Sequence, residues 1–173
     1  MTIRDILTFP NKKLREVASE VSLPISSDIH ALIEDLAQTM YAAPGVGLAA
    51  TQIGVAKRVA VTDIAWRKEE DSERELHVWI NPEIIARSGS EKGEEGCLSL
   101  PKVYENVQRA TSIKVRWVDL EGQSHESHFE GFQAVALQHE FDHLDGKIFI
   151  DHLSVLKRKM VVRRIKKMQE DES

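Results

Sequence analysis

The sequence has almost no cysteine and no long hydrophobic run. Cys97 is the only cysteine among 173 residues, which excludes an intramolecular disulfide bond and fits a reducing compartment. No uninterrupted apolar stretch reaches the roughly 20 residues needed to cross a bilayer. No apolar core of signal-peptide length follows Met1. We therefore expect a cytoplasmic protein that does not associate with a membrane.

An excess of positive charge is also missing. The formal net charge is -5, so the molecule as a whole lacks the basic character of a nucleic-acid-binding protein. One local exception lies near the C-terminus. Residues 153–168 contain no acidic side chain and these basic ones: Lys157, Arg158, Lys159, Arg163, Arg164, Lys166 and Lys167. The simplest interpretation of this cluster is the solvated face of a helix.

Length and composition limit the number of domains. A chain of 173 residues with 42% hydrophobic residues can bury a proper core but is short for two full domains. We expect a single domain over residues 1–173, in which residues 153–173 form a C-terminal helical extension. We also expect a monomer.

Three segments have the spacing of amphipathic helices. The first begins after capping residues at positions 26–28, ends near Tyr41, and repeats apolar residues at Ile29, Leu32, Ile33, Leu36 and Met40. The second is predicted over residues 132–144, where Gly146 marks its end. The third is predicted over residues 153–168, with an apolar stripe made of Leu153, Leu156, Met160, Val161, Ile165 and Met168.

Other segments have the composition of strands and loops. Residues 58–62 and 76–80 are short runs typical of strands, and Asn81-Pro82 is predicted to end the second. Residues 113–118 and 125–129 flank a turn and predict an antiparallel hairpin. Residues 45–54 are predicted to form a tight buried loop, and residues 67–75 a solvated one.

The second helix carries a pattern typical of a metal site. His139 and His143 are four residues apart, so both imidazoles project from one face of the helix, one turn apart. Glu140 lies between them and can reach a water molecule bound to the ion. In a chain with seven histidines this spacing also arises by chance. The predicted fold is therefore α+β: antiparallel strands around a central metal-binding helix, with N-terminal and C-terminal helices.

A catalytic metal site of this kind needs a third protein ligand and an open position. Residue type alone leaves several candidates, namely Cys97, His125, His128, Asp142 and Asp145. Cys97 follows Gly96, which lets the chain bend, and precedes Pro101, which is predicted to stop further strand pairing. Because an isolated cysteine is usually a small buried residue, its role stays open at this point.

Three motifs follow one another along the chain. They are GVGLAATQ at residues 45–52, EGCLSLP at residues 95–101 and QHEFDH at residues 138–143. Their order and spacing resemble those of the peptide deformylase family. The resemblance covers most of the chain, including INP at residues 80–82 and a helical C-terminus like that of many bacterial members. One departure is Gly93, where some members carry a bulkier apolar side chain beside the substrate cleft.

The resemblance implies a role for each matching residue. The metal ligands would be Cys97, His139 and His143. The general acid/base would be Glu140, and the oxyanion would be stabilised by Gln52 together with the backbone N–H of Leu98. The methionine pocket of the family would be lined by the matching positions Val46, Glu95, Phe132, Val135 and Ala136. Gly47, which would also bind substrate, would allow a close approach of the backbone beside Gln52.

Two further points concern Gln52 and Asp142. Gln52 has no expected helix-capping role that would compete with oxyanion binding. Asp142 is either a partner that orients a ligating imidazole or a solvated residue of the helix.

The reaction of the family removes formate from the N-terminal formyl-methionine of newly made chains. The partners would thus be N-formyl-methionyl nascent polypeptides, and the cofactor one divalent metal ion. The resemblance implies Fe(II) in the cell, while a site of one thiolate and two imidazoles also suits Zn(II), Ni(II) or Co(II). Bacterial members also suggest a second interpretation of the basic C-terminal helix, which is ribosome contact near the peptide exit.

Three other functions are compatible with parts of the pattern. In a thiol hydrolase, Cys97 would attack the substrate after activation by His139 or His143. A metallopeptidase that cuts internal bonds shares the helix motif, although a cysteine ligand and a methionine-sized pocket would be unusual for it. A structural metal site in a binding module would need a fourth protein ligand, and the sequence has no second cysteine.

Overall fold

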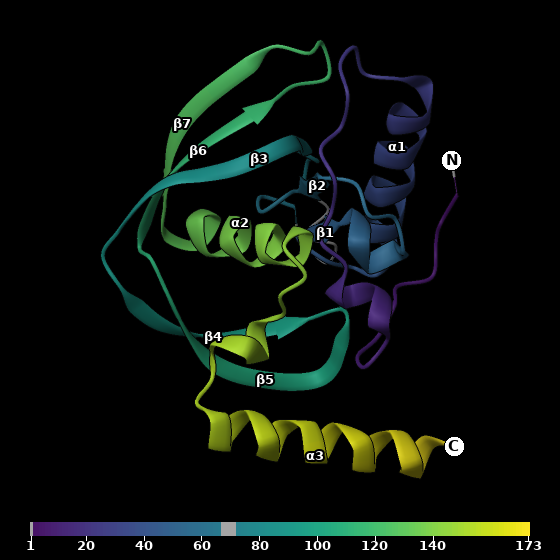
Figure 1. Cartoon of the computed structure of the whole chain (residues 1–173), viewed down its shortest axis with the longest axis vertical. Coiled ribbons are helices and arrows are strands. Elements are labelled where there is room, and N and C mark those ends of the chain that lie inside the picture. Colours follow the sequence, from purple (N-terminus) through teal and green to yellow (C-terminus); the bar gives the residue numbers. More distant parts are fainter. Residues whose placement is uncertain (1, 67–71) are drawn as a thin grey trace.

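Two antiparallel sheets and three α-helices make up the fold (Figure 1). The computed structural model describes residues 2–66 and 72–173, and these counts refer to those ranges. The predicted α+β class is confirmed. Of the loop predicted over residues 67–75, residues 67–71 lie outside the described residues, and residues 72–75 form neither helix nor strand.

The larger sheet has the strand order β1-β2-β3-β6-β7. Its strands are β1 (Gly47–Ala49), β2 (Val59–Thr62), β3 (His77–Ser88), β6 (Ser112–Val118) and β7 (Ser124–Glu130). The predicted hairpin is confirmed as β6 and β7, in which Val115 pairs with Ser127. The prediction of a plain loop over residues 45–54 is wrong, because β1 and a 3-10 helix (Ala50–Ile53) lie there. Because the segment is rich in glycine, its composition did not predict the buried three-residue strand β1, which pairs with β2.

The prediction that Asn81-Pro82 ends a strand is also wrong. β3 continues through both residues to Ser88. The register to β6 shifts between Ile80 and Glu83, and Asn81 adopts a positive φ of 49°. The Asn81 side chain accepts a hydrogen bond from Val21 N at 2.7 Å. The strand therefore forms a β-bulge at Pro82, which has no N–H to donate to the sheet, and pairing with β6 continues beyond it.

The smaller sheet is the hairpin of β4 (Glu91–Cys97) and β5 (Leu100–Arg109). Pro101 does not stop the pairing, contrary to the prediction. The register passes from Cys97–Leu100 to Glu95–Glu105, so Pro101 lies in the irregular stretch where no ladder donor is needed. The tight reversal places Cys97 at the very end of β4.

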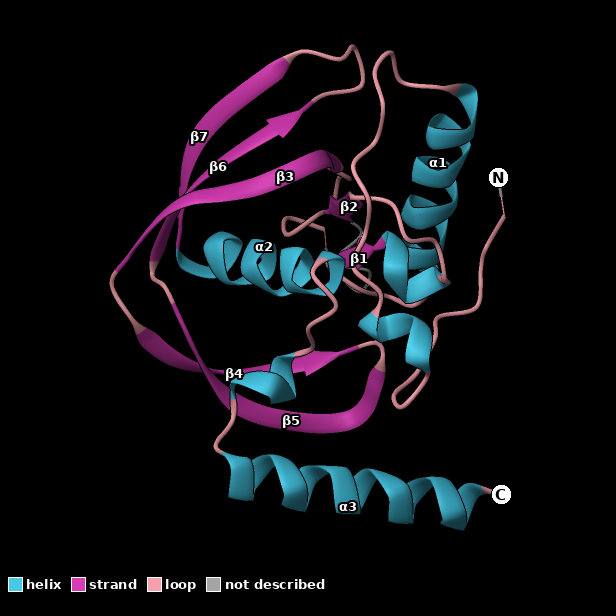
Figure 2. Ribbon diagram, in the orientation of Figure 1, coloured by secondary structure: helices cyan, strands magenta, loops and turns pink. Residues whose placement is uncertain are grey.

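The central helix α2 (Gly131–Leu144) lies between the two sheets, as predicted (Figure 2). Its buried residues Ala134, Leu137 and Phe141 pack with Trp79 of β3 and Val115 of β6. The first helix, α1 (Ser27–Ala42), begins after Ser26, whose hydroxyl accepts from Ile29 N, and it packs on β1 and β2. Both sides of α2 are thus covered by strands, which holds its side chains in fixed positions.

The C-terminal helix α3 (Val155–Glu172) packs outside the β4–β5 hairpin. Only part of its predicted apolar stripe is correct. Val161 and Ile165 are buried, but Leu156 is 72% exposed and Met160 is 56% exposed. The helix contacts β5 and a 3-10 helix (Phe149–His152) along one narrow face. The stripe inferred from periodicity was therefore wider than the surface that receives it.

Among the described residues, none of the helices combines the length and the apolar character that crossing a membrane requires.

Candidate metal centre

The two histidines of α2 point toward the β4–β5 hairpin from adjacent turns. His143 is 1% exposed, and its Nε2 lies 3.3 Å from Nε2 of His139. Helical geometry predicts this pairing from the four-residue spacing. Burial lowers the pKa of His143 well below its ordinary value, so its imidazole is neutral, which is the form that binds a metal.

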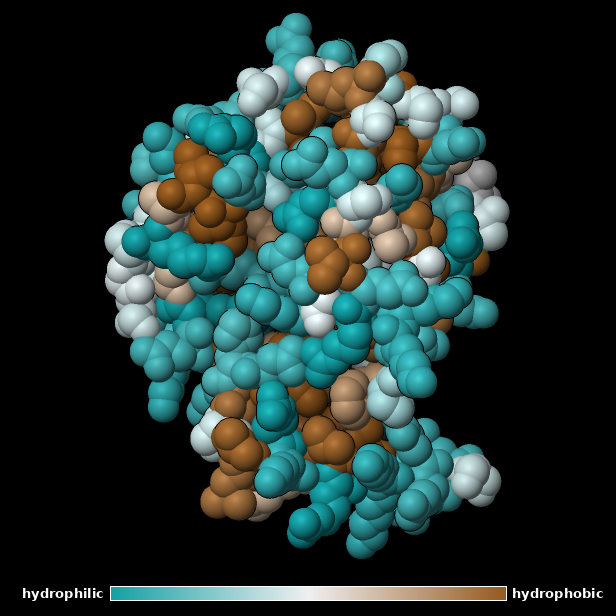
Figure 3. Space-filling view, viewed as in Figure 1, coloured by the Kyte–Doolittle hydropathy of each residue, from teal (hydrophilic) through white to brown (hydrophobic). Residues whose placement is uncertain are grey.

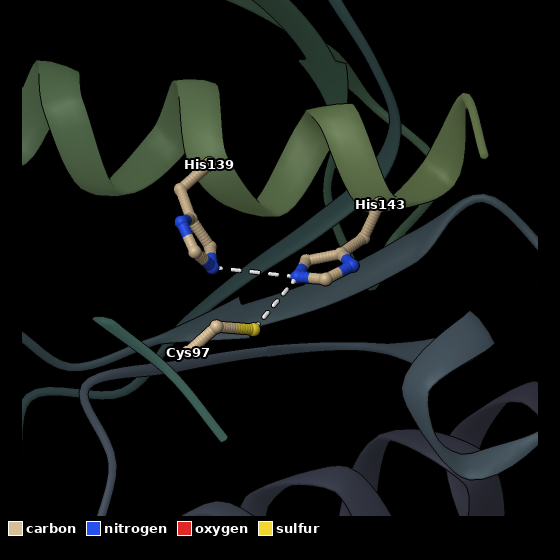
Figure 4. Close-up of side chains that lie close together, drawn as sticks. All are labelled: Cys97, His139 and His143. Carbon is tan, nitrogen blue, oxygen red and sulfur yellow. Dashed lines mark hydrogen bonds between the residues drawn. The ribbon is translucent and has the colours of Figure 1, made fainter. Parts of the chain in front are cut away.

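Cys97 completes a group of three ligand atoms. Its Sγ lies 3.4 Å from His143 Nε2, and the three ligand atoms of Cys97, His139 and His143 lie within 4.8 Å of one another (Figure 4). Tetrahedral coordination with bonds of about 2.0–2.3 Å separates ligand atoms by roughly 3.3–3.6 Å. The distances from His143 Nε2 to Cys97 Sγ (3.4 Å) and to His139 Nε2 (3.3 Å) match this range, so the residues fit one divalent ion.

The other candidate ligands do not join this group. His125 of β7 interacts with Asp119, and Asp145 pairs with Arg58 at 2.8 Å. His128 is opposite Lys114 on the β6–β7 hairpin. Among the described residues, the three-residue group of Cys97, His139 and His143 is the one that could hold a metal.

Glu95 orients His139. One carboxylate oxygen of Glu95 lies 3.0 Å from His139 Nδ1, and Arg109 donates two hydrogen bonds to the same carboxylate, at 2.8 and 2.9 Å. Burial alone would raise the pKa of Glu95, but the hydrogen bonds from Arg109 and His139 outweigh it and lower the pKa to about 2. The ionised carboxylate accepts a hydrogen bond from the protonated Nδ1. Nε2 of His139 is therefore free to bind a metal.

Asp142 forms no hydrogen bond with either ligating ring. Its Oδ2 accepts from Arg109 Nη1 at 2.6 Å and lies 2.7 Å from His152 Nε2. The orienting role considered for Asp142 therefore falls to Glu95, and Asp142 supports it only through Arg109. Arg109 is 5% exposed and was missed by the sequence analysis. Buried and exposed residues alternate toward the end of β5, and Arg109 falls on the buried face with Val107. This alternation could have identified it.

His139 sits where positive charge is favoured. Burial by itself would lower its pKa, but hydrogen bonds to Cys97 and Glu95 outweigh burial and raise the pKa well above the ordinary value. A divalent cation between the ligand atoms would satisfy the same negative groups without the proton.

Glu140 is buried beside the ligands. It is 5% exposed, and its Oε1 has no hydrogen-bond partner. Burial is the main reason that its pKa is raised to about 7. A Cβ at position 47 would lie 2.5 Å from Glu140 Oε2, so only glycine there leaves room for the carboxylate. An unpartnered buried oxygen of this kind is ready to receive a water molecule or a substrate proton.

Gln52 presents its amide nitrogen to the same site. Its Oε1 accepts from Ala49 N at 3.0 Å, and its Nε2 donates to Ser99 Oγ at 3.1 Å and lies 3.7 Å from Cys97 Sγ. Gln52 does have a capping contact, contrary to expectation. Because a backbone N–H can only donate, this contact decides which end of the amide faces the ligands. Ser99, which was not predicted from the sequence, accepts a hydrogen bond from the Nε2 end of the amide.

These groups surround a cavity of about 650 Å³ between α2, β4 and the segment before β1. The cavity contacts two of the ligands and all the residues that the sequence analysis placed around the substrate. Its lining includes Val46, Gly47, Gln52, Glu95, Cys97, Leu98, Phe132, Val135, Ala136, His139 and Glu140. Ligand atoms, a buried carboxylate and an oriented amide donor in one cavity are the groups that metal-assisted hydrolysis of an acyl compound requires.

Known proteins share both the sequence and the fold. The family model described as polypeptide deformylase matches residues 3–159. A peptide deformylase of Alkalilimnicola ehrlichii is 51% identical over 168 residues, which cover 97% of this chain and 92% of that protein. One from Afipia carboxidovorans is 48% identical, covering 96% of each.

Solved structures agree with these matches. The crystal structure of a peptide deformylase from Legionella pneumophila superposes with a TM-score of 0.87 at 43% identity, covering 99% of this chain and 98% of that one. The peptide deformylase of Ehrlichia chaffeensis in complex with actinonin has a TM-score of 0.86 at 36% identity, covering 97% and 98%.

Proposed function

Because the chain belongs to the polypeptide deformylase family, we propose that it hydrolyses the formyl group from the N-terminal formyl-methionine of newly synthesised proteins and releases formate. The observation that carries this proposal is the group of Cys97, His139 and His143 at a cavity that Cys97, His139 and Glu140 line. Residues 1–173 would act as one catalytic domain. The place of action would be the cytoplasm, where nascent chains are made.

The ligands Cys97, His139 and His143 would hold one divalent ion, with Fe(II) the ion in the cell and Zn(II), Ni(II) or Co(II) as alternatives. When bound, the ion supplies Lewis acidity, which acidifies a coordinated water and polarises the formyl oxygen. The protein contributes the orientation of its ligands. Glu95 lies 3.0 Å from His139 Nδ1, and Arg109 Nε in turn donates to Glu95 at 2.8 Å.

Glu140 would transfer the proton in both halves of the reaction. As a base it takes a proton from the attacking water, and as an acid it returns that proton to the amine that leaves. A pKa raised to about 7 by burial suits a group that must gain and lose a proton near neutral pH. A cation held nearby would oppose this rise, because opposite charge favours the carboxylate.

Two donors would stabilise the negative charge that develops on the formyl oxygen. The first is Nε2 of Gln52, whose orientation is set by Ala49 N and Ser99 Oγ. The second is the backbone N–H of Leu98, which follows the ligand Cys97 directly. The loss of one such donor typically costs roughly 3–4 kcal/mol of transition-state stabilisation.

The substrate would lie along β4 with its first side chain against α2. β4 pairs only with β5 among the described strands, and residues 91–97 line the cavity, so an extended peptide could pair with the unoccupied edge. The methionine side chain would meet Val46, Gly47, Phe132, Val135 and Ala136. Glu95 shares the lining, but its carboxylate is engaged by Arg109 and His139.

Metal removal and replacement tests this proposal. The protein is prepared anaerobically, its metal content is measured, and hydrolysis of a formyl-Met peptide is compared with that of an acetyl-Met peptide and an internally cleavable peptide. We expect activity on the formyl peptide alone, loss of activity with a chelator, and recovery on adding Fe(II), Ni(II) or Co(II). Full activity in the chelated protein, together with trapping of an acyl group on Cys97, would establish the thiol hydrolase instead.

We further propose that α3 contacts the ribosome. Its exposed surface combines basic residues, including Arg158, Lys159, Arg163 and Lys166 around a shallow groove, with an apolar area at its first turns (Figure 3). That area contains Val155, Leu156 and Met160, each more than half exposed. Phosphates of ribosomal RNA attract such cations, while the apolar residues suit a protein or base surface beside them.

A further inference from the structure

Gly93 lies on the wall of the cavity that faces α2. In the β4–β5 register it pairs with Val107, two positions before the Glu95–Glu105 pair. Because side chains alternate along a strand, position 93 shares a face with Glu95 and Cys97. Gly93 and Val107 both line the cavity. A side chain at position 93 would therefore project toward the space in which the substrate is expected.

Neither the backbone nor close packing explains a glycine at this position. Gly93 is not among the glycines with positive φ, and a Cβ built on it would meet no atom within 4 Å. Gly47 and Gly96 differ, since a Cβ at those positions would lie 2.5 Å from Glu140 Oε2 and 2.6 Å from Tyr104 Cε1. The partner of Gly93, Val107, is nevertheless 1% exposed. Because Val107 is already packed in a core cluster, the missing side chain leaves open space beside Gly93 itself.

The opposite wall of this volume is apolar. Phe132, Val135 and Ala136, from the first turns of α2, line the same cavity. Phe132 is 55% exposed, so its ring is not enclosed by other residues. An apolar ligand group would bury the exposed ring of Phe132.

Building on the proposed function, we infer that Gly93 is a specificity-determining residue that widens the pocket for the first side chain of the formylated peptide. The widened pocket accepts apolar side chains bulkier than methionine, including aromatic ones. A branched side chain at position 93 would fill the space and restore a narrower pocket.

The test compares formyl-Met and formyl-Phe peptides of otherwise identical sequence, using metal-loaded enzyme. The variants are Gly93→Ala, Gly93→Val and Gly93→Ile. A Cβ at position 93 meets no atom within 4 Å, and the β-branched valine and isoleucine suit a strand. All three variants should therefore fold, which thermal unfolding checks. We expect Gly93→Ile to lower kcat/KM for the formyl-Phe peptide at least about tenfold while changing that for formyl-Met less than about threefold. Alanine and valine should give intermediate losses in that order.

Gln108→Ile is the matched control. Gln108 is exposed on the other face of the hairpin, opposite Lys92, and does not line the cavity. It should leave both substrates unchanged. Equal losses for both peptides in Gly93→Ile, or a wild-type enzyme that cleaves formyl-Met but not formyl-Phe, would overturn the inference and leave the proposed function standing. A metal-loaded wild type inactive on formyl-Met would contradict the proposed function itself.

Discussion

Glu140 is a carboxyl group held in an unfavourable environment. Its Oε1 is buried without a hydrogen-bond partner, and its Oε2 occupies space that a side chain at position 47 would fill if that residue were not glycine. A buried polar atom without a partner costs about 1–3 kcal/mol. Such a cost is expected where a group must exchange protons, because a fully hydrogen-bonded carboxylate would be a poor base.

The first prediction at this scale concerns the replacement of Glu140. Glu140→Ala and Glu140→Gln should each bind one equivalent of metal, because the three ligands are unchanged. Both should lose at least about a hundredfold in kcat for a formyl-Met peptide, which is the usual contribution of general acid/base catalysis. Metal content and steady-state kinetics are measured on the same preparation. Near-normal turnover in either variant would remove Glu140 from the proposed mechanism.

A second prediction at the residue scale follows from the contacts of Arg109. Arg109→Met removes the donors to Glu95 while keeping a similar length of apolar side chain, so Glu95 would hold His139 less firmly. We expect metal affinity to fall about tenfold to a hundredfold, as is typical when a partner of a ligating histidine is lost. Competition with a chelator of known affinity measures this. Arg116→Met, at an exposed ion pair with Glu126, is the control and should not change the affinity.

At the scale of elements, α3 combines a buried face with an exposed apolar area. Val161 and Ile165 join Val103 and Val107 of β5 and Phe149 in one core cluster. Glu105 of β5 also pairs with Lys157 at 3.4 Å and Arg164 at 3.1 Å. These exposed ion pairs contribute little stability, so apolar contacts decide where the helix docks.

Ile165→Ala and Met160→Ala therefore should differ in their effect on stability. Ile165 is 5% exposed, and its truncation should lower the free energy of unfolding by about 2–4 kcal/mol. Met160 is 56% exposed, and its truncation should change that free energy by less than about 0.5 kcal/mol. Urea denaturation of both variants gives the comparison. Equal losses would mean that the wider stripe inferred from periodicity is the docking face.

At the scale of the whole molecule, negative net charge and a basic helix coexist. The chain carries a formal net charge of -5, while α3, the helix with the basic residues, lies outside the β4–β5 hairpin (Figure 1). The active-site cavity is lined by other elements. The structure therefore allows binding of an anionic surface through α3 to be altered without touching the catalytic groups.

We predict that Arg163→Ser with Lys166→Ser weakens ribosome binding in low salt and spares turnover of a short formyl-Met peptide. Losing two phosphate contacts should reduce the slope of log affinity against log salt by roughly one to two. Lys12→Ser with Lys13→Ser removes two exposed charges elsewhere and should leave binding unchanged. These substitutions are preferable to removal of α3, which would expose the core around Val161. Equal binding by both double variants would assign the basic residues of α3 to solvation alone.

Much of the secondary structure could be predicted because local patterns decide it. The spacing of apolar residues in α1 and α2 and the alternation in β6 reflect single faces that each element buries. The predictions failed where non-local contacts dominate. The Asn81 side chain bonds to the backbone of Val21, sixty residues away. This contact fixes the chain where β3 passes through Pro82. The face of α3 is selected by the width of the surface beneath it.

The candidate site divides in the same way. The sequence by itself determined that His139 and His143 project from one face of a helix with Glu140 between them, because a four-residue spacing has one geometric outcome. Motif resemblance pointed to Cys97 and Gln52. Only the tertiary structure decided that Glu95 rather than Asp142 contacts His139, that Arg109 supports it, and that Gly93 faces open space. The physical reason is that these relations join separate strands and α2, and they depend on distances across the fold that no spacing along the chain specifies.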